Sequence, residues 1–125
     1  MYITISELFR YRQYKFFPVA YWFDRKTYSI QDITLLSMPE TEAYERLIPL
    51  FQIDQDSIQN AFVQTLNNRP LMNKYNTRNV CFEEFIQRNN LWKQWWDYYR
   101  KTVSEIATEW CQKNKIKYIN DISLN

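Results

Sequence analysis

The most restrictive feature of this sequence is that its 125 residues include neither glycine nor histidine. Without glycine, no residue takes positive φ angles freely, and loops that cradle phosphates in Walker or dinucleotide sites need such residues. Without histidine, the chain lacks the usual general base, the usual partner of a Ser or Cys nucleophile, and all imidazole metal ligands. These two absences predict a protein that is not an enzyme and binds no cofactor.

Helix ends must then rely on asparagine for the left-handed conformation that glycine normally supplies. The asparagines near predicted element boundaries are Asn67, Asn68, Asn89, Asn90, Asn114 and Asn120.

Aromatic residues make up 18% of the chain, which predicts a core built from large flat side chains. The length suits one domain over residues 1–125, and the sequence has no repeat, linker or low-complexity tract at which a second domain would begin. The net charge of +2 is too small to imply nucleic acid by itself.

The expected location is the cytoplasm, with no membrane contact. No stretch approaches the roughly 18 to 20 apolar residues that span a bilayer, and the start, with Glu7 early, lacks the pattern of a secretory signal. Cys81 and Cys111 lie among apolar neighbours in predicted helices, where reduced thiols serve as small core residues. A disulfide or redox pair is the alternative.

The first half of the chain predicts a short helix followed by a small sheet. Thr4 and Glu7 fit a capping box that opens a helix over about 5–13. Residues 19–23 and 28–33 alternate as the strands of a β-hairpin with a four-residue loop. A short helix follows Pro39, and residues 47–51 form a third strand, which Pro49 places at a sheet edge.

The second half predicts helices at about 55–66, 69–76 and 80–88, and a last helix of more than five turns from Trp92. Large residues recur along this last helix with steps of three and four, and we expect them to face the core: Trp92, Trp95, Tyr99, Val103, Ile106 and Trp110. Residues 117–119 form a short strand or an irregular end. The predicted fold class is therefore α+β, mainly helical, with a small antiparallel sheet packed against amphipathic helices.

Two carboxylate clusters are the only candidates for acid–base work or for a hard cation: Asp54 with Asp56, and Glu83 with Glu84. Simpler roles explain both. Asp54 and Asp56 suit the start of a helix, and Glu83 and Glu84 point in different directions around one.

The segment Phe9–Phe16 interleaves cations with aromatic rings, a combination that neutralises phosphates while stacking bases. We favour a structural interpretation, in which the rings are buried and the basic side chains lie over them. The alternative is weak nucleic-acid binding through Arg10, Arg12, Lys15, Arg25 and Lys26.

The segment Trp92–Tyr99 is too aromatic for one helix face to bury completely. If Trp92, Trp95 and Tyr99 face the core, we expect Trp96 to lie at the margin of the core and to be exposed. Exposed Trp and Tyr side chains often form contacts at protein interfaces. Trp96 and Tyr98 are therefore the candidate protein-binding residues. Burial of Trp96 under the hairpin or the opening helix is the alternative.

The second half also resembles uncharacterised protein family 0158, a family of small bacterial proteins. The resemblance rests on Phe82-Glu83-Glu84-Phe85, on Trp95 or Trp96 with Tyr98-Tyr99-Arg100, and on the run Ile106 to Ile116. Residues 22–27 and 47–50 look like the family's hairpin and third strand, so the likeness covers most of 19–119. Residues 79–84 depart from it, being acidic and free of glycine where the family is basic.

The resemblance implies an α+β fold in an intracellular bacterial or phage setting, but the family carries no established activity to transfer. We therefore expect a non-enzymatic protein-binding or regulatory domain whose partner is another protein, with a homo-oligomer also open. Weak binding of nucleic acid is the second hypothesis.

Overall fold

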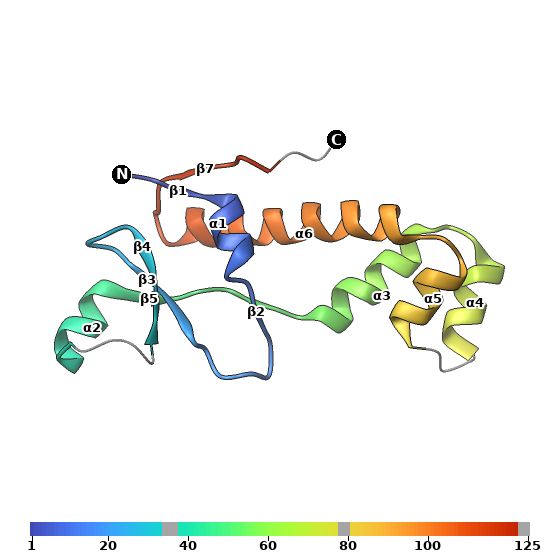
Figure 1. The fold of residues 1–125 in the computed structure, drawn as a ribbon, viewed down its shortest axis with the longest axis horizontal. Helices are drawn as coiled ribbons and strands as arrows, with labels where there is room; N and C mark the ends of the chain where they lie inside the picture. The colour runs from blue at the N-terminus through green and yellow to red at the C-terminus, as the bar shows by residue number, and fades with distance from the viewer. Residues whose placement is uncertain (34–37, 78–80, 123–125) are drawn as a thin grey trace. The chain divides into compact units, whose positions relative to one another are not determined.

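The fold is mainly helical α+β, as the sequence predicted, in a computed structural model that describes residues 1–33, 38–77 and 81–122 (Figure 1). The strands are β1 (Ile3–Thr4), β2 (Gln13–Tyr14), β3 (Tyr21–Asp24), β4 (Ser29–Asp32), β5 (Leu47–Pro49), β6 (Gln52–Ile53) and β7 (Tyr118–Ile119). The helices are α1 (Ile5–Arg10), α2 (Glu40–Arg46), α3 (Gln55–Thr65), α4 (Arg69–Thr77), α5 (Phe82–Arg88) and α6 (Trp92–Lys113).

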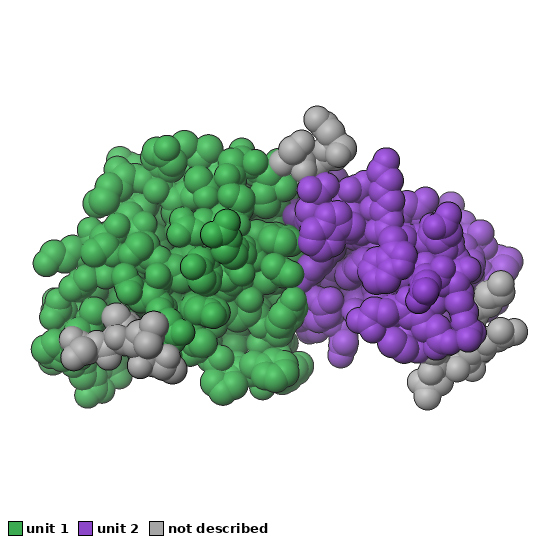
Figure 2. Space-filling model, viewed as in Figure 1, with its two compact units in different colours: residues 1–53, 103–123, 125 green, residues 54–102, 124 purple. Residues whose placement is uncertain are grey.

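The described residues fall into two compact units, which Figure 2 colours separately. Unit 1 comprises residues from 1–53 and 103–122, and unit 2 comprises residues from 54–102. The helix α6 begins in unit 2 and ends in unit 1. The expectation of a single domain stays a prediction.

Unit 1 contains the predicted three-stranded antiparallel sheet, in the order β4–β3–β5. The hairpin pairs Asp24 with Ser29, so its loop has four residues, as predicted, but they are 25–28 rather than 24–27. Pro49 lies on β5, which is an edge strand, because proline has no amide to donate to a further neighbour.

Two short parallel pairs, which the sequence did not predict, connect distant parts of unit 1. β1 pairs with β7, aligning Ile3 with Tyr118, and β2 pairs with β6, aligning Gln13 with Gln52. Each pair is only two residues long, too short for a recognisable pattern of alternating side chains.

The first helix is shorter than predicted. Thr4 Oγ1 caps α1 by accepting a hydrogen bond from the Glu7 amide at 3.2 Å, as expected, but the helix ends at Arg10. The reason lies in Gln13, whose buried side chain accepts hydrogen bonds from the amides of Ala20 and Tyr21 at 2.8 and 3.0 Å. These distant partners hold Gln13 in a strand.

Each unit has its own buried side chains. In unit 1 the Phe23 ring is fully buried and meets Tyr28 and Trp110 edge to face, at 5.0 and 6.0 Å between ring centroids. In unit 2 the Trp95 ring stacks on Tyr99 at 5.3 Å and meets Phe82 at 4.7 Å. Both units thus contain clusters of aromatic side chains.

The two cysteines lie in opposite environments. Cys111 is buried in unit 1, as predicted, and burial raises the pKa of its thiol to about 11. The prediction for Cys81 was wrong: Cys81 is exposed, because it precedes the first turn of α5 as its N-cap. Both are free thiols. None of the helices described here is long and apolar enough to span a bilayer.

Candidate functional site

The two predicted protein-binding residues lie on opposite sides of α6. Trp96 is 44% exposed, whereas Tyr98 is half-buried and packs against Phe62 at 5.4 Å between ring centroids. Two steps of about 100° place residues 96 and 98 about 200° apart around a helix. The structure therefore does not bring Trp96 and Tyr98 together into one surface.

Trp92 is the exposed neighbour of Trp96, one helical turn away, and is itself 49% exposed. The sequence placed Trp92 in the core, and that prediction was wrong. Leu91, immediately before the helix, is buried and occupies the core at this end of α6. Arg100 lies a further turn along, with its guanidinium 5.8 Å from the centre of the Trp96 ring.

Tyr98 instead lines a shallow hollow in unit 2, with a volume of about 440 Å³. The other residues that line it are Phe62, Thr65, Leu66 and Gln94.

Two strongly exposed aromatic side chains lie side by side in the connection between β2 and β3, and one of them, Phe16, has the highest exposure of the large apolar side chains in the described residues. Phe16 is 88% exposed and Phe17 is 68% exposed, and we call this pair the phenylalanine tip. The favoured interpretation of the sequence had the Phe16 ring buried, which was wrong. The alternation of cations and rings in this segment carried no signal that the chain would turn away from the core here.

Hydrogen bonds hold the backbone of the phenylalanine tip. The Lys15 amide donates to the Ile53 carbonyl at 2.8 Å, and Gln52 Nε2 donates to the Phe17 carbonyl at 3.0 Å. Phe16 has a φ of 77°, in the left-handed region that costs a residue with a Cβ about 1–2 kcal/mol. The chain thus keeps two apolar rings in solvent on a fixed and strained backbone.

The five basic residues of the nucleic-acid hypothesis divide into two sets. Arg10 is exposed, Arg12 is half-buried with its guanidinium 4.4 Å from the Phe9 ring centre, and the Lys15 ammonium lies 5.5 Å from the Phe16 ring centre. These residues precede β3.

Arg25 and Lys26 are exposed in the hairpin loop that follows β3. Gln13 bonds to Tyr21 at the start of β3, whereas Arg25 comes directly after its last residue. The two sets therefore lie toward opposite ends of the strand and do not form one basic patch.

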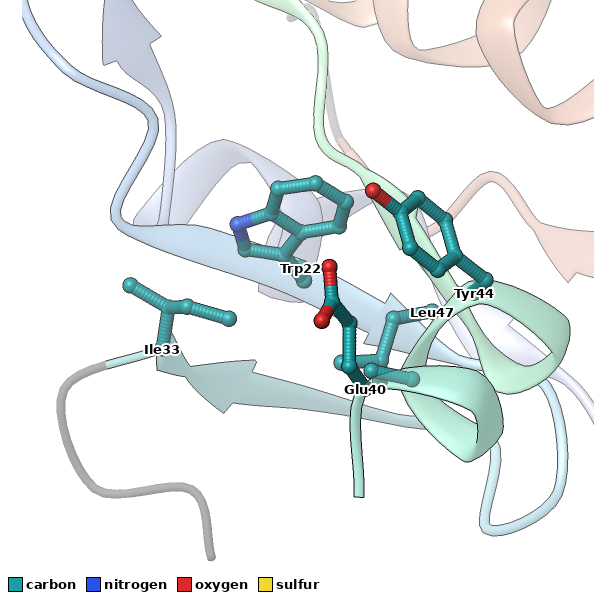
Figure 3. A pocket seen from close by; sticks show the side chains of 6 residues that line it. Trp22, Ile33, Glu40, Tyr44 and Leu47 are labelled. Atoms are coloured by element: carbon teal, nitrogen blue, oxygen red, sulfur yellow. The ribbon is translucent and has the colours of Figure 1, made fainter. Parts of the chain in front are cut away.

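A pocket of about 180 Å³ opens in unit 1 between α2 and the sheet (Figure 3). Four of its lining residues follow the spacing of one helix face, since Glu40, Ala43, Tyr44 and Leu47 are at i, i+3, i+4 and i+7. The other two are Trp22 on β3 and Ile33 after β4. Trp22 reaches the pocket because it points to the opposite side of the sheet from its neighbour Phe23, which enters the core.

An ion-pair network attaches the other side of α2 to the sheet. Arg46 Nε donates to Oδ1 of the buried Asp24 at 3.2 Å, and Arg46 Nη1 donates to Glu42 Oε1 at 2.6 Å. Burial raises the pKa of the Asp24 carboxyl, but hydrogen bonds from Arg46 and from the Lys26 and Thr27 amides outweigh it and hold that pKa below its usual value. The network turns the face that carries Glu40 and Tyr44 toward the pocket.

One of the residues that line this pocket, Trp22, has a polar atom that is buried without a hydrogen-bond partner within the described ranges. Trp22 Nε1 is buried and has no hydrogen-bond partner among the residues that the structure describes. The sequence interpretation used Trp22 only as a strand former. The spacing of residues 40, 43, 44 and 47 was the available signal, but it indicates a pocket only once α2 is known to cover Trp22.

The carboxylate clusters have the simpler roles that the sequence suggested. Asp54 Oδ1 accepts a hydrogen bond from the Ser57 amide at 3.2 Å and caps α3. Glu83 accepts from the Cys81 thiol at 3.1 Å, and Glu84 pairs with Arg88 along α5. Within 1–33, 38–77 and 81–122, no three or more Cys, Asp or Glu side chains are grouped as metal ligands.

The fold and these surfaces define a mainly helical α+β protein with exposed aromatic groups and a small pocket whose lining is mostly apolar. Comparisons with models of protein families, with curated proteins and with solved structures gave no match. The resemblance to uncharacterised protein family 0158 therefore stays a prediction.

Proposed function

We propose that this chain is a non-enzymatic protein-binding or regulatory domain, and that the phenylalanine tip is its principal contact with a protein partner. The observation that carries the proposal is the exposure of Phe16 and Phe17, at 88% and 68%, on a backbone held by hydrogen bonds. Burial of these rings against a partner would bring a large gain, since each aromatic side chain buries roughly 150–250 Å².

The strain at Phe16 supports the same interpretation. A left-handed φ is unfavourable for an aromatic residue, and strained conformations of this kind persist where the surrounding structure enforces them, often at binding sites. A rigid tip also loses little conformational entropy when it docks, which favours affinity.

Trp92 and Trp96 form a second candidate contact in unit 2. Each is nearly half exposed, and the exposed Lys93 adjoins them, so this surface suits a partner with apolar and acidic groups. Tyr98 contributes separately, at the hollow that it shares with Phe62. Trp96 and Tyr98 thus remain proposed contacts, on two surfaces.

The test is capture of partners from a nuclease-treated lysate at increasing salt, with the wild-type chain and matched variants. We expect Phe16→Ser with Phe17→Ser to lose the captured proteins, which the wild type retains at about 1 M salt, where ion pairs are screened within roughly 3 Å. Tyr2→Ser, at another strongly exposed aromatic residue, is the control that should retain them.

Two results would contradict the assignment of the tip. Unchanged capture by the double variant would remove the phenylalanine tip from the interface. Loss with Trp96→Ser alone would transfer the contact to α6. Light scattering of the purified chain identifies the case in which the partner is a second copy.

Weak binding of nucleic acid is the second candidate, favoured by the position of Lys15 beside the exposed Phe16 ring, which could stack on a base. It predicts binding of a labelled single-stranded oligonucleotide that weakens steeply with salt, and weakens further in Lys15→Gln. Recovery of the captured proteins that vanishes after nuclease treatment would favour this candidate.

A cytoplasmic location accompanies the proposal. It is supported by the two free thiols, since oxidising compartments favour disulfides. Fractionation of cells that produce the chain would test it.

A further inference from the structure

We propose that the pocket between α2 and the sheet binds an alkylammonium group, either of a small organic cation or of a lysine side chain. Its walls combine two aromatic residues, Trp22 and Tyr44, with one carboxylate, Glu40 (Figure 3). This ligand site is separate from the phenylalanine tip and does not depend on the function proposed above.

The size of the pocket restricts what it holds. Its volume of about 180 Å³ is below the roughly 300–1,000 Å³ of sites for drug-sized ligands. It is several times the roughly 30 Å³ that one water molecule occupies in the liquid. A single side chain or a small head group is therefore the fitting occupant.

The charge of the pocket selects a cation. Glu40 is the only charged residue of its lining, and it forms no ion pair with the residues that the structure describes. Arg46, the cation of the same helix, is held on the other side of α2 by Asp24 and Glu42. A carboxylate without a neighbouring cation in the lining repels anions and attracts an ammonium group.

The aromatic residues select an alkylated cation. In Figure 3 the Glu40 carboxylate points toward the Trp22 and Tyr44 rings. Tyr44 is 80% exposed, so its ring borders the mouth of the pocket, where a cation would meet the carboxylate. Rings attract cations within about 6 Å of their centres, and aromatic walls are the usual site for quaternary ammonium groups. Because Trp22 Nε1 is buried, a ligand in the pocket meets the Trp22 ring rather than its N–H donor.

The remaining lining is apolar and suits the alkyl part of such a ligand. Ile33, Ala43 and Leu47 contribute hydrocarbon surface around the rings. A strongly hydrated bare metal ion would gain nothing from these walls, whereas methyl or methylene groups would be removed from water.

The experiment is a titration of the full chain with choline, followed by the indole N–H signal of Trp22 in ¹H–¹⁵N NMR spectra. The matched probe is 3,3-dimethylbutan-1-ol, which has the same shape without the charge. We expect saturable shifts of the Trp22 signal with choline. The affinity for the neutral alcohol should be weaker by a factor of at least about ten. Equal affinity for both probes, or no saturable shift with choline, would overturn the proposal.

Variants assign the binding to the named residues. Glu40→Gln and Tyr44→Ala should each weaken choline binding about two- to fivefold, as expected for exposed contacts, whereas Tyr44→Phe, which keeps the ring, should retain it. The control is the variant Phe16→Ser with Phe17→Ser, which should bind choline as the wild type does. The choline experiment therefore tests the pocket independently of the phenylalanine tip. Choline affinity that is unchanged in Glu40→Gln would remove the carboxylate from recognition.

A second series distinguishes the two sources of the ammonium group. N-acetyl-lysine amide and its ε-trimethylated form are titrated in the same way. Tighter binding of either than of choline assigns the pocket to a lysine side chain, and the reverse order assigns it to a free cation. Saturable binding of either kind that requires Glu40 supports the proposal.

Discussion

At the residue scale, the absence of glycine has a visible cost in backbone conformation. Among the residues that the structure describes, five take positive φ angles: Phe16, Tyr28, Asn67, Asn90 and Lys115. Asparagine tolerates this region better than other residues, because its short side chain bonds to the local backbone. Phe16, Tyr28 and Lys115 have no such compensation.

Replacement of Phe16 by glycine should separate stability from binding. We expect Phe16→Gly to raise the free energy of unfolding by about 0.5–1 kcal/mol. Glycine relieves the strain of the left-handed conformation, but it also increases the conformational entropy of the unfolded chain, which offsets part of the stabilisation. The same variant should lose the partner that the tip captures. Urea titration measures the first effect.

Phe17→Gly is the matched control for this prediction. Phe17 has no positive φ, so glycine there adds chain entropy without relieving strain and should not stabilise the chain. If both variants changed stability equally, strain at Phe16 would not explain the effect.

Asp24 should make the stability of unit 1 depend on pH. Its pKa in the folded chain lies below the unfolded value of about 3.9, so the stabilisation is complete above that value and is lost as the pH falls through the folded pKa. We expect Asp24→Asn to cost about 1.5–3 kcal/mol at pH 7, because it removes the charged acceptor of Arg46.

Chemical denaturation between pH 7 and pH 2 measures the Asp24 effect. The difference between wild type and Asp24→Asn should shrink toward the acid end of this range. A constant difference across it would mean that ionisation of Asp24 is not the cause. Glu84→Gln, which breaks an exposed ion pair of α5, is the control and should change stability by less than about 1 kcal/mol.

At the element scale, local chemistry predicted much of what the structure contains. The caps Thr4 and Asp54 and the four-residue hairpin loop depend on neighbours within a few positions, so their residues were sufficient to identify them. Asn67 and Asn90 occupy left-handed positions as expected, whereas Lys115 takes the position expected for Asn114. A shift of one residue at a helix end is beyond what sequence spacing resolves.

The features that sequence did not predict depend on distant partners. Gln13 leaves the helical pattern because its amide group bonds to residues 20, 21 and 50. The pocket depends on the packing of α2 against the sheet, which Arg46 stabilises by reaching Asp24, 22 residues earlier. Trp92 was placed in the core by periodicity, which gives a side chain a direction but does not say whether another element covers it. Phe16 was placed there by the structural interpretation of its segment, which has the same limit.

The aromatic cluster of unit 2 should depend strongly on Phe62. Its ring is buried and meets Phe82, Trp95 and Tyr98 at 6.4, 5.4 and 5.4 Å between centroids. Phe62→Ala should therefore destabilise unit 2 by about 3–5 kcal/mol, through lost burial and the cavity that remains. Trp92→Ala, which removes an exposed ring, should cost less than about 1 kcal/mol.

Amide hydrogen exchange is the measurement for Phe62→Ala, because it reports on each unit separately. Faster exchange is expected along α3 and α5. Protection that remained at wild-type levels in both helices would show that the cluster does not stabilise them.

At the scale of the whole molecule, unit 1 is built from two separated stretches of chain. Val103, Ala107 and Cys111 of α6 are completely buried in it, together with Ile5 and Leu8 of α1. A chain that ends at Thr102 lacks the first three of these residues and β7. We expect the NMR signals of residues 1–53 in that shortened chain to collapse to unfolded positions.

A variant with Lys101→Gln is the control for the shortened chain, since residue 101 is exposed and precedes the second stretch of unit 1, which begins at residue 103. Its spectrum should match that of the wild type. Dispersed signals for residues 1–53 in the shortened chain would show that the first stretch is sufficient to fold.

The pairing of β1 with β7 also sets an order of events on the ribosome. Ser6 bonds to Asp121 across 115 positions, so the opening segment emerges long before its partners are synthesised. At about 5–20 residues per second, translation of the stretch from Asp54 to Thr102 alone delays those partners by about 2–10 seconds. During this interval Ile5, Leu8 and Phe23 lack their final cover, which makes nascent unit 1 a natural client for chaperones that bind apolar segments.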